Sequence, residues 1–147
     1  GVAPRNTADA NCAVEVYWQV GLSSVRTSAM LSLVDHLMFE PLFDALRTKK
    51  QLGYSVRGSS RNTLQVLGFV IGVVSATHGA EAIKAEVDAF VEVWVASLEV
   101  MGSSEYAKNV AAAVANKLQD DHNMLEEAER YFSEIATRQY SFDRAEL

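Results

Sequence analysis

The sequence predicts an α+β fold, in which a small antiparallel sheet carries helices packed on one face. Strand-like alternation of apolar and polar residues falls in the first half of the chain, and apolar residues spaced by three and four dominate the second half. No repeat, linker or low-complexity tract interrupts the 147 residues. We therefore expect a single domain over residues 1–147.

A strand and two helices are expected first. Residues 12–20 alternate between apolar and other side chains, as in a half-buried strand. Ser23 or Ser24 can cap the helix that follows. We expect this helix to close at Glu40-Pro41, because the residue before a proline is disfavoured in the helical region, and a second, short helix to start at Pro41.

A hairpin is expected next. Residues 52–57 read as one strand and residues 63–74 as the other, with a turn at Gly58–Asn62 between them. The second strand is almost entirely apolar and contains Gly68 and Gly72. Such a run is typical of a central strand that is covered on both faces.

Three helices are expected to complete the chain. The first ends at Gly102, and Ser103 or Ser104 begins the second. Asn123 and Glu126 resemble a capping box for the third. The expected apolar stripes are Ile83, Val87, Phe90, Trp94, Leu98 and Met101; then Tyr106, Val110, Val114 and Leu118; then Leu125, Ala128, Phe132 and Ile135.

The candidate site lies in the segment from Glu40 to Val56, where a basic cluster meets the helix end and Gly53 can provide a left-handed exit into a strand. Arg47 and Tyr54 can hydrogen-bond one ligand group, the arginine as donor and the phenol as donor or acceptor. The residues alone leave another interpretation open. Arg47 can pair with Asp44 or a helix carbonyl, and Tyr54 can pack in the sheet.

Residues Leu46 to Tyr54, preceded by Glu40-Pro41-Leu42-Phe43, resemble the L-R-T-K-x-Q-L-G-Y signature of the insulysin/pitrilysin family of zinc metallopeptidases. Asn11 to Gln19 resembles the strand that leads into the family's preceding helix. Tyr131 to Arg144 resembles its Y-[WF]-x-E-I-x-x-x-x-Y-x-F-D-R segment. A nine-residue match with two collinear supports is far more specific than a lone short motif.

The resemblance implies an insulysin/mitochondrial processing peptidase-like fold, and an incomplete domain of the C-terminal half excised from a larger peptidase. It also implies that Arg47 and Tyr54 contact the substrate backbone and help to stabilise the tetrahedral intermediate. The implied partners are a peptide substrate and the N-terminal catalytic half of the same protein. The implied zinc is bound in that other half, so the fragment is expected to be inactive alone.

No zinc motif is present in this sequence. The family's inverted H-x-x-E-H motif needs two histidines and a glutamate on one helix. His36, His78 and His122 are too far apart in sequence to form it. His36 and Glu40 are one helical turn apart, but an ordinary hydrogen bond or a solvated face is the preferred interpretation. His78 and His122 are expected to be exposed, and Cys12 is expected to be an inert core thiol.

Charge and composition exclude other classes of function. The net charge of −6 makes a nucleic-acid binder a poor interpretation, although residues 40–61 carry five basic residues against two acidic ones. This local patch fits a peptide carbonyl or carboxylate better. No apolar run approaches the roughly 18 residues that a membrane span requires. One cysteine and no signal-peptide pattern lead us to expect a cytoplasmic protein.

Three hypotheses about function follow. The first is a substrate-binding domain of an insulysin-like zinc metalloendopeptidase whose catalytic zinc lies elsewhere in the parent chain. The second is a non-catalytic scaffold or peptide-binding subunit on the same fold. The third is a free-standing interaction module that uses the basic patch of residues 40–61.

Overall fold

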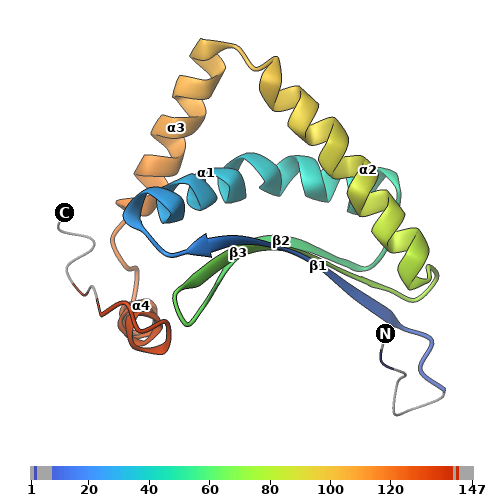
Figure 1. The fold of residues 1–147 in the computed structure, drawn as a ribbon, viewed down its shortest axis with the longest axis horizontal. Helices are drawn as coiled ribbons and strands as arrows, with labels where there is room; N and C mark the ends of the chain where they lie inside the picture. The colour runs from blue at the N-terminus through green and yellow to red at the C-terminus, as the bar shows by residue number, and fades with distance from the viewer. Residues whose placement is uncertain (1, 3–7, 141, 143–147) are drawn as a thin grey trace. The chain divides into compact units, whose positions relative to one another are not determined.

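The computed structural model describes residues 2, 8–140 and 142 (Figure 1). Within this described part, the elements in chain order are β1 (Cys12–Leu22), α1 (Val25–Leu42), the π-helix η1 (Phe43–Lys49), β2 (Ser55–Thr63), β3 (Val66–Ser75), α2 (Ala80–Glu99), α3 (Ser103–Lys117) and α4 (Met124–Ala136). The predicted α+β class is confirmed.

The sheet is antiparallel, and its strands lie in the order β1-β3-β2. Leu67, Phe69, Val70, Ile71 and Val73 of β3 are all buried. The prediction that this apolar run forms the central strand is therefore confirmed. β1 alternates between half-buried and exposed residues over its first half, as the period of two predicted for residues 12–20 requires.

The hairpin turn lies further along the chain than predicted. Gly58–Asn62 is not a turn but part of β2, and the chain reverses at Leu64 and Gln65. Both turn residues have positive φ, 49° and 69°. A two-residue turn in which both residues have positive φ has a backbone twist that matches the twist of the paired strands. The Leu-Gln pair has no Asn-Gly signal, but the Asn62 side chain accepts a hydrogen bond from the Gln65 amide at 3.1 Å across the turn.

The helix of α1 does not close at Glu40-Pro41, as we had predicted, but continues through Pro41 to Leu42. Leu42 keeps helical angles, with φ −61° and ψ −50°, and the chain passes directly into η1. A proline removes one helical hydrogen bond and crowds the preceding turn. The wider π-helical turn that follows is a known way to accommodate such a disruption without ending the helix.

The chain folds as two compact units. The first comprises Gly1–Trp18, Leu37–Ser59 and Val70–Val100, and the second comprises Gln19–His36, Ser60–Phe69 and Met101–Leu147. The three strands and α1 contribute residues to both. The expectation of one domain over residues 1–147 stays a prediction.

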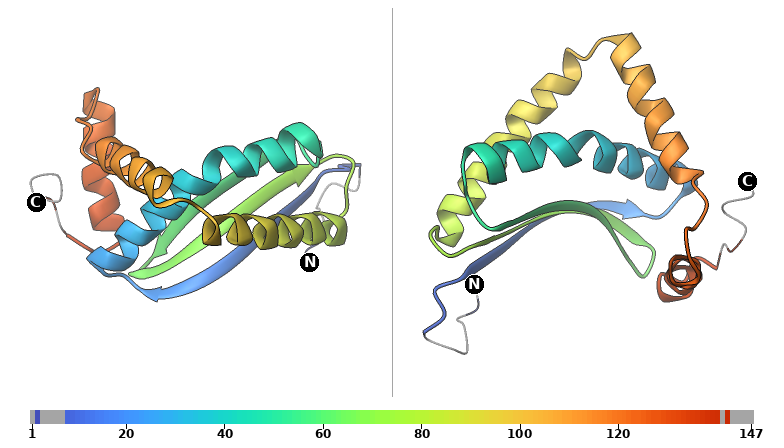
Figure 2. Two further views of the ribbon diagram at one scale, coloured as in Figure 1. Left: turned by 90° about the horizontal axis from the view of Figure 1, so that it is seen from above. Right: turned by 180° about the vertical axis from the view of Figure 1, so that it is seen from behind.

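In the first unit, α2 lies on the same face of the strands as the end of α1 (Figures 1 and 2). α2 also contacts η1. The apolar stripe predicted for residues 83–101 supplies Ile83, Val87 and Trp94 to this core. The other buried apolar residues of the unit are Met38, Leu42, Leu46, Leu52, Val70, Ile71 and Val73.

In the second unit, helix caps agree with the sequence. The Ser24 hydroxyl accepts a hydrogen bond from the Thr27 amide, at 3.1 Å, at the start of α1. The Asn123 side chain accepts from the amides of Leu125 and Glu126 at the start of α4, at 3.0 and 3.1 Å. The Glu126 carboxylate accepts hydrogen bonds from the main-chain amide of His122 and from the side-chain amide of Asn123, both at 2.9 Å.

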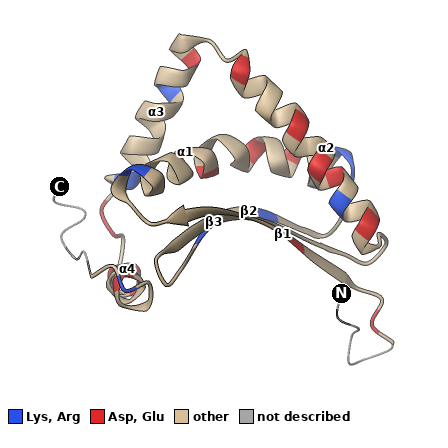
Figure 3. Ribbon diagram, viewed as in Figure 1, with Lys and Arg blue, Asp and Glu red and all other residues tan. Residues whose placement is uncertain are grey.

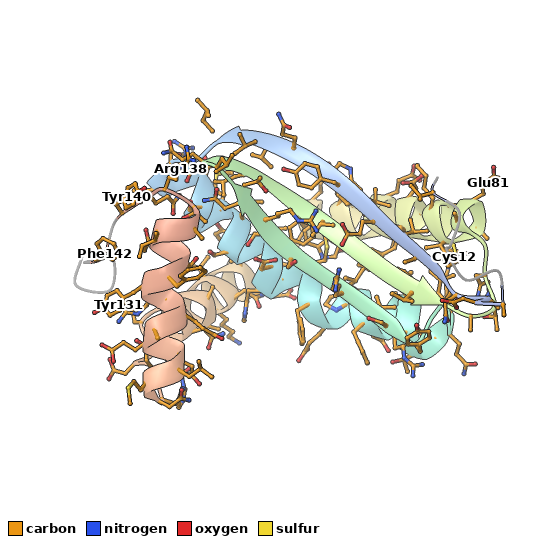
Figure 4. All side chains as sticks on the ribbon, turned by 90° about the horizontal axis from the view of Figure 1, so that it is seen from below. Cys12, Glu81, Tyr131, Arg138, Tyr140 and Phe142 are labelled. Atoms are coloured by element: carbon orange, nitrogen blue, oxygen red, sulfur yellow. The ribbon has the colours of Figure 1, made fainter. Side chains whose placement is uncertain are left out.

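The apolar stripe predicted for α4 is present but exposed. Leu125, Phe132 and Ile135 have 67%, 68% and 51% of their surface accessible. Beside them, the rings of Tyr131 and Phe142 lie 6.0 Å apart, centre to centre (Figure 4). The end of the family-like segment, Asp143 and Arg144, lies outside the described residues.

No helix in the described part of the chain is long and apolar enough to cross a membrane.

Candidate functional site

The candidate site is built on the junction between η1 and β2. Leu46 of η1 is completely buried, and Leu52 is 2% exposed. The Leu52 amide donates to the Leu46 carbonyl at 2.9 Å, so the chain folds back on the helix end. Gln51, between them, has φ 49°. Two buried leucines and a left-handed residue thus fix the path from Arg47 to Tyr54.

Gly53 is required for space rather than for a left-handed conformation. A Cβ atom at Gly53 would lie 2.2 Å from the carbonyl oxygen of Val74 in β3. The predicted left-handed exit falls on Gln51 instead, so that prediction was wrong by two positions. The Tyr54 amide then donates to the same Val74 oxygen at 3.0 Å. This close approach holds the segment against the central strand.

Arg47 and Tyr54 are both available to a ligand. Arg47 is half-buried on η1, and Tyr54 has 59% of its surface exposed. Among the described residues, neither side chain makes a hydrogen bond, an ion pair or a ring contact. Asp44 pairs with Lys49 at 2.7 Å, so the alternative pairing of Asp44 with Arg47 does not form. Their role in binding stays a prediction.

Most of the basic patch of residues 40–61 is neutralised by acidic partners. Lys49 pairs with Asp44 within η1. Lys50 pairs with Glu86 of α2, a helix along which acidic residues predominate (Figure 3). Arg57 pairs with Glu15 of β1 at 2.8 Å. Sequence reasoning missed Glu15 and Glu86, because both partners are far from the patch along the chain.

The pair between Arg57 and Glu15 crosses the central strand at Gly72. A Cβ atom at Gly72 would lie 3.1 Å from Nε of Arg57. The missing side chain therefore gives the arginine room to lie over β3. Together with neighbouring strand residues, these three border a shallow depression, whose other lining residues are Ala13, Val14, Ser55, Val73 and Val74.

The described part of the chain gathers no set of side chains that fits a zinc site. Within residues 2, 8–140 and 142, no three His, Cys, Asp or Glu side chains gather closely enough to hold a metal ion. His122 is exposed and contacts Glu126 at 3.1 Å. His78, which we had expected to be exposed, is half-buried, and its Nδ1 lies 2.9 Å from the Thr77 hydroxyl. The loop before α2 folds around the buried Ser75, which explains this difference.

A protein-family model matches most of the chain. Residues 33–132 match the family model described as PQQ synthase PqqF-like, C-terminal lobe domain 4. This range includes the whole of the segment from Glu40 to Val56.

Similar proteins of known name support the same family. The chain is 35% identical to human nardilysin over 145 residues, which is 97% of this chain and 13% of that protein. It is 34% identical to human insulin-degrading enzyme over 142 residues, or 95% of this chain and 14% of that protein. An Arabidopsis thaliana nardilysin-like protein is also 34% identical over 142 residues. The chain therefore spans only a small part of the length of these relatives.

The fold has a solved counterpart. The crystal structure of pitrilysin superposes with a TM-score of 0.77 at 22% sequence identity, and covers 95% of this chain and 15% of that one. This likeness shows that the fold is shared.

Proposed function

Because this chain belongs to the insulysin/pitrilysin family of metallopeptidases, as part of its C-terminal region, we propose that it supplies substrate-binding groups to a zinc peptidase. Arg47 and Tyr54 bind the peptide substrate. In this proposal the zinc is held by another part of the same polypeptide, as the resemblance to the family implies.

One observation supports this role above the others. Arg47 and Tyr54 lie on a junction whose backbone is tightly fixed, yet both side chains lack a partner among the described residues. Structural arginines usually satisfy their donors within the protein. A fixed backbone with free donors is what a binding site requires, because the donors need no reorganisation when the ligand arrives.

The proposed chemistry is hydrogen bonding to the peptide. The Arg47 guanidinium and the Tyr54 phenol can both donate to the carbonyl that is attacked. These bonds strengthen as negative charge develops on that oxygen, so they favour the transition state over the substrate. The chain's own contribution is thus binding, orientation and stabilisation of charge.

The test uses the longest natural polypeptide that carries this sequence, with Tyr54→Phe and Arg47→Met as variants. We expect kcat/KM for peptide cleavage to fall by about 100-fold in each, with zinc content unchanged. Matched controls are Tyr106→Phe, a half-exposed tyrosine on α3, and Arg26→Met, an exposed arginine on α1. Wild-type rates in both site variants would contradict the proposal. A polypeptide that neither binds zinc nor cleaves peptides would favour the non-catalytic scaffold instead.

A further inference from the structure

Lys50 is the residue at which the candidate site is tied to a neighbouring helix. It directly follows η1, and its amide donates to the Ala45 carbonyl at 3.0 Å. Its ammonium group forms an ion pair with the carboxylate of Glu86 on α2. The two side chains are 46% and 39% exposed, so the contact lies at the surface.

Glu86 is a rigid anchor for this contact. Its neighbours Ile83 and Val87 are completely buried, which fixes α2 on the core. η1 packs against the same helix, and its Leu46 is also completely buried. The backbone at Glu86 therefore has a defined position relative to η1, and the side chain reaches Lys50 from there.

The segment from Lys50 to Tyr54 is held mainly through its main chain and its buried Leu52, and has few polar side-chain restraints. Its ends are held by the main-chain bonds of Leu52 to η1 and of Tyr54 to β3. Between them, Gln51 has a φ of 49°, which is unfavourable for a residue with a side chain. Within the described residues, Lys50 provides this segment's one side-chain ion pair or hydrogen bond to another element.

We propose that the Lys50–Glu86 ion pair is a positioning device, which sets the orientation of residues 50–54 so that Arg47 and Tyr54 reach the same substrate group. This inference rests on the proposed function of those two residues. Neither Lys50 nor Glu86 touches substrate. They act through the path of the backbone, because small displacements of a binding group reduce the rate of a positioned reaction.

The activity test compares Glu86→Gln, Lys50→Gln and the swapped pair Lys50→Glu with Glu86→Lys, in the longest natural polypeptide. An exposed ion pair contributes little, so we expect each single variant to lower kcat by about threefold to fivefold with a smaller change in KM. The swap restores the rate to within about twofold, since it rebuilds the attraction with reversed charges. Failure of the swap to restore kcat would overturn the inference.

The control is the ion pair of Lys84 and Asp88 within α2, whose side chains are 61% and 44% exposed and so somewhat more accessible than those of Lys50 and Glu86. Lys84→Gln and Asp88→Asn remove similar charge from α2 without touching the junction. We expect both to retain the wild-type kcat. An equal loss of rate in these controls would mean that the charge of the helix matters and the Lys50 contact does not, which would also overturn the inference.

Hydrogen exchange separates the positioning role from the proposed function. In Glu86→Gln we expect faster exchange at the amides of Leu52 and Tyr54, and wild-type exchange in the swapped pair. Unchanged exchange in Glu86→Gln would overturn the positioning role, whatever the activity. If Arg47 and Tyr54 variants keep full activity while this exchange changes, the proposed function fails and the structural tie remains.

Discussion

Gly53 is the residue at which backbone packing leaves no room for a side chain. We expect Gly53→Ala to lower the free energy of unfolding by about 3 kcal/mol, because the new Cβ would overlap the Val74 carbonyl and force the strand pairing to shift. Urea denaturation of the two proteins measures this. Gly79→Ala is the control, since a Cβ there meets nothing within 4 Å and only the cap of α2 changes. We expect Gly79→Ala to lower the free energy of unfolding by less than about 1 kcal/mol.

Asp35 of α1 makes stability depend on pH. Burial raises the pKa of this carboxyl above its ordinary value of 3.8, and hydrogen bonds from Ser60 and the charge of Lys117 oppose the shift. The folded state therefore binds the proton more tightly than the unfolded state. The stability this contributes is full below pH 3.8 and is lost as the pH rises through the raised pKa.

Asp35→Asn should remove this dependence. We expect the free energy of unfolding of the wild type, relative to the variant, to fall as the pH rises from 3 to 6. The asparagine keeps an oxygen to accept the Ser60 amide, which donates to Asp35 at 2.9 Å. Denaturant titrations across that pH range give the measurement, and a difference that rises with pH would contradict the assignment.

Glu126 is a control for Asp35, because its pKa is shifted in the opposite direction. The His122 amide and side chain lower the pKa of this carboxyl below 4.5. The folded state therefore holds this proton less tightly, so the contribution is present above pH 4.5 and is lost as the pH falls through the lowered pKa. Relative to Glu126→Gln, the wild type should gain stability with rising pH, in contrast to its behaviour relative to Asp35→Asn.

At the level of elements, the hairpin between β2 and β3 carries an unfavourable turn. Leu64 has φ 49°, which asparagine tolerates far better than leucine does. We expect Leu64→Asn to raise the free energy of unfolding by about 0.5 kcal/mol. Leu118→Asn is the control, because Leu118 is similarly exposed but has φ −91°. Equal effects of the two substitutions would show that removing an exposed leucine, and not relief of the turn, is responsible.

The apolar stripe of α4 has the spacing of a buried helix face, but its side chains are exposed. We expect Phe132→Ser in this chain to change the free energy of unfolding by less than about 0.5 kcal/mol, since two thirds of that side chain is already accessible. Ile83→Ala in the buried stripe of α2 should cost about 2–5 kcal/mol. Thermal or urea unfolding distinguishes the two. A large loss in Phe132→Ser would show that the stripe is covered in solution.

For the molecule as a whole, charge argues against polyanion binding. The net charge is −6, and in residues 40–61 Lys49, Lys50 and Arg57 pair with Asp44, Glu86 and Glu15. We expect no binding of a fluorescent single-stranded RNA at 0.15 M salt below about 100 µM protein, measured by anisotropy. Binding at low micromolar concentration would favour the interaction module over the peptidase domain.

The spacing of apolar residues along the chain correctly predicted several strands and helices. The alternation in residues 12–20, the apolar run of β3 and the spacing of Ile83, Val87 and Trp94 each correspond to an observed element. The capping residues Ser24 and Asn123 were equally readable, because a cap is satisfied by amides two or three positions away.

Some errors were local. The turn falls at Leu64-Gln65, where the Asn62 side chain accepts the Gln65 amide, and α1 continues through Pro41 into the adjacent η1. The other errors arose where distant segments decide the structure. The need for Gly53 comes from Val74, and the partners of Lys50 and Arg57 lie on α2 and β1. No local propensity carries such information.

The sequence by itself determined the fold class, because short-range periodicity is written in the order of residues. Its resemblance to a known family signature indicated the family and pointed to Arg47 and Tyr54 as candidate residues. The tertiary structure decided which of these groups are satisfied within the protein and which stay available. That distinction depends on contacts between segments far apart in the chain, such as Lys50 with Glu86, which exist only once the chain has folded.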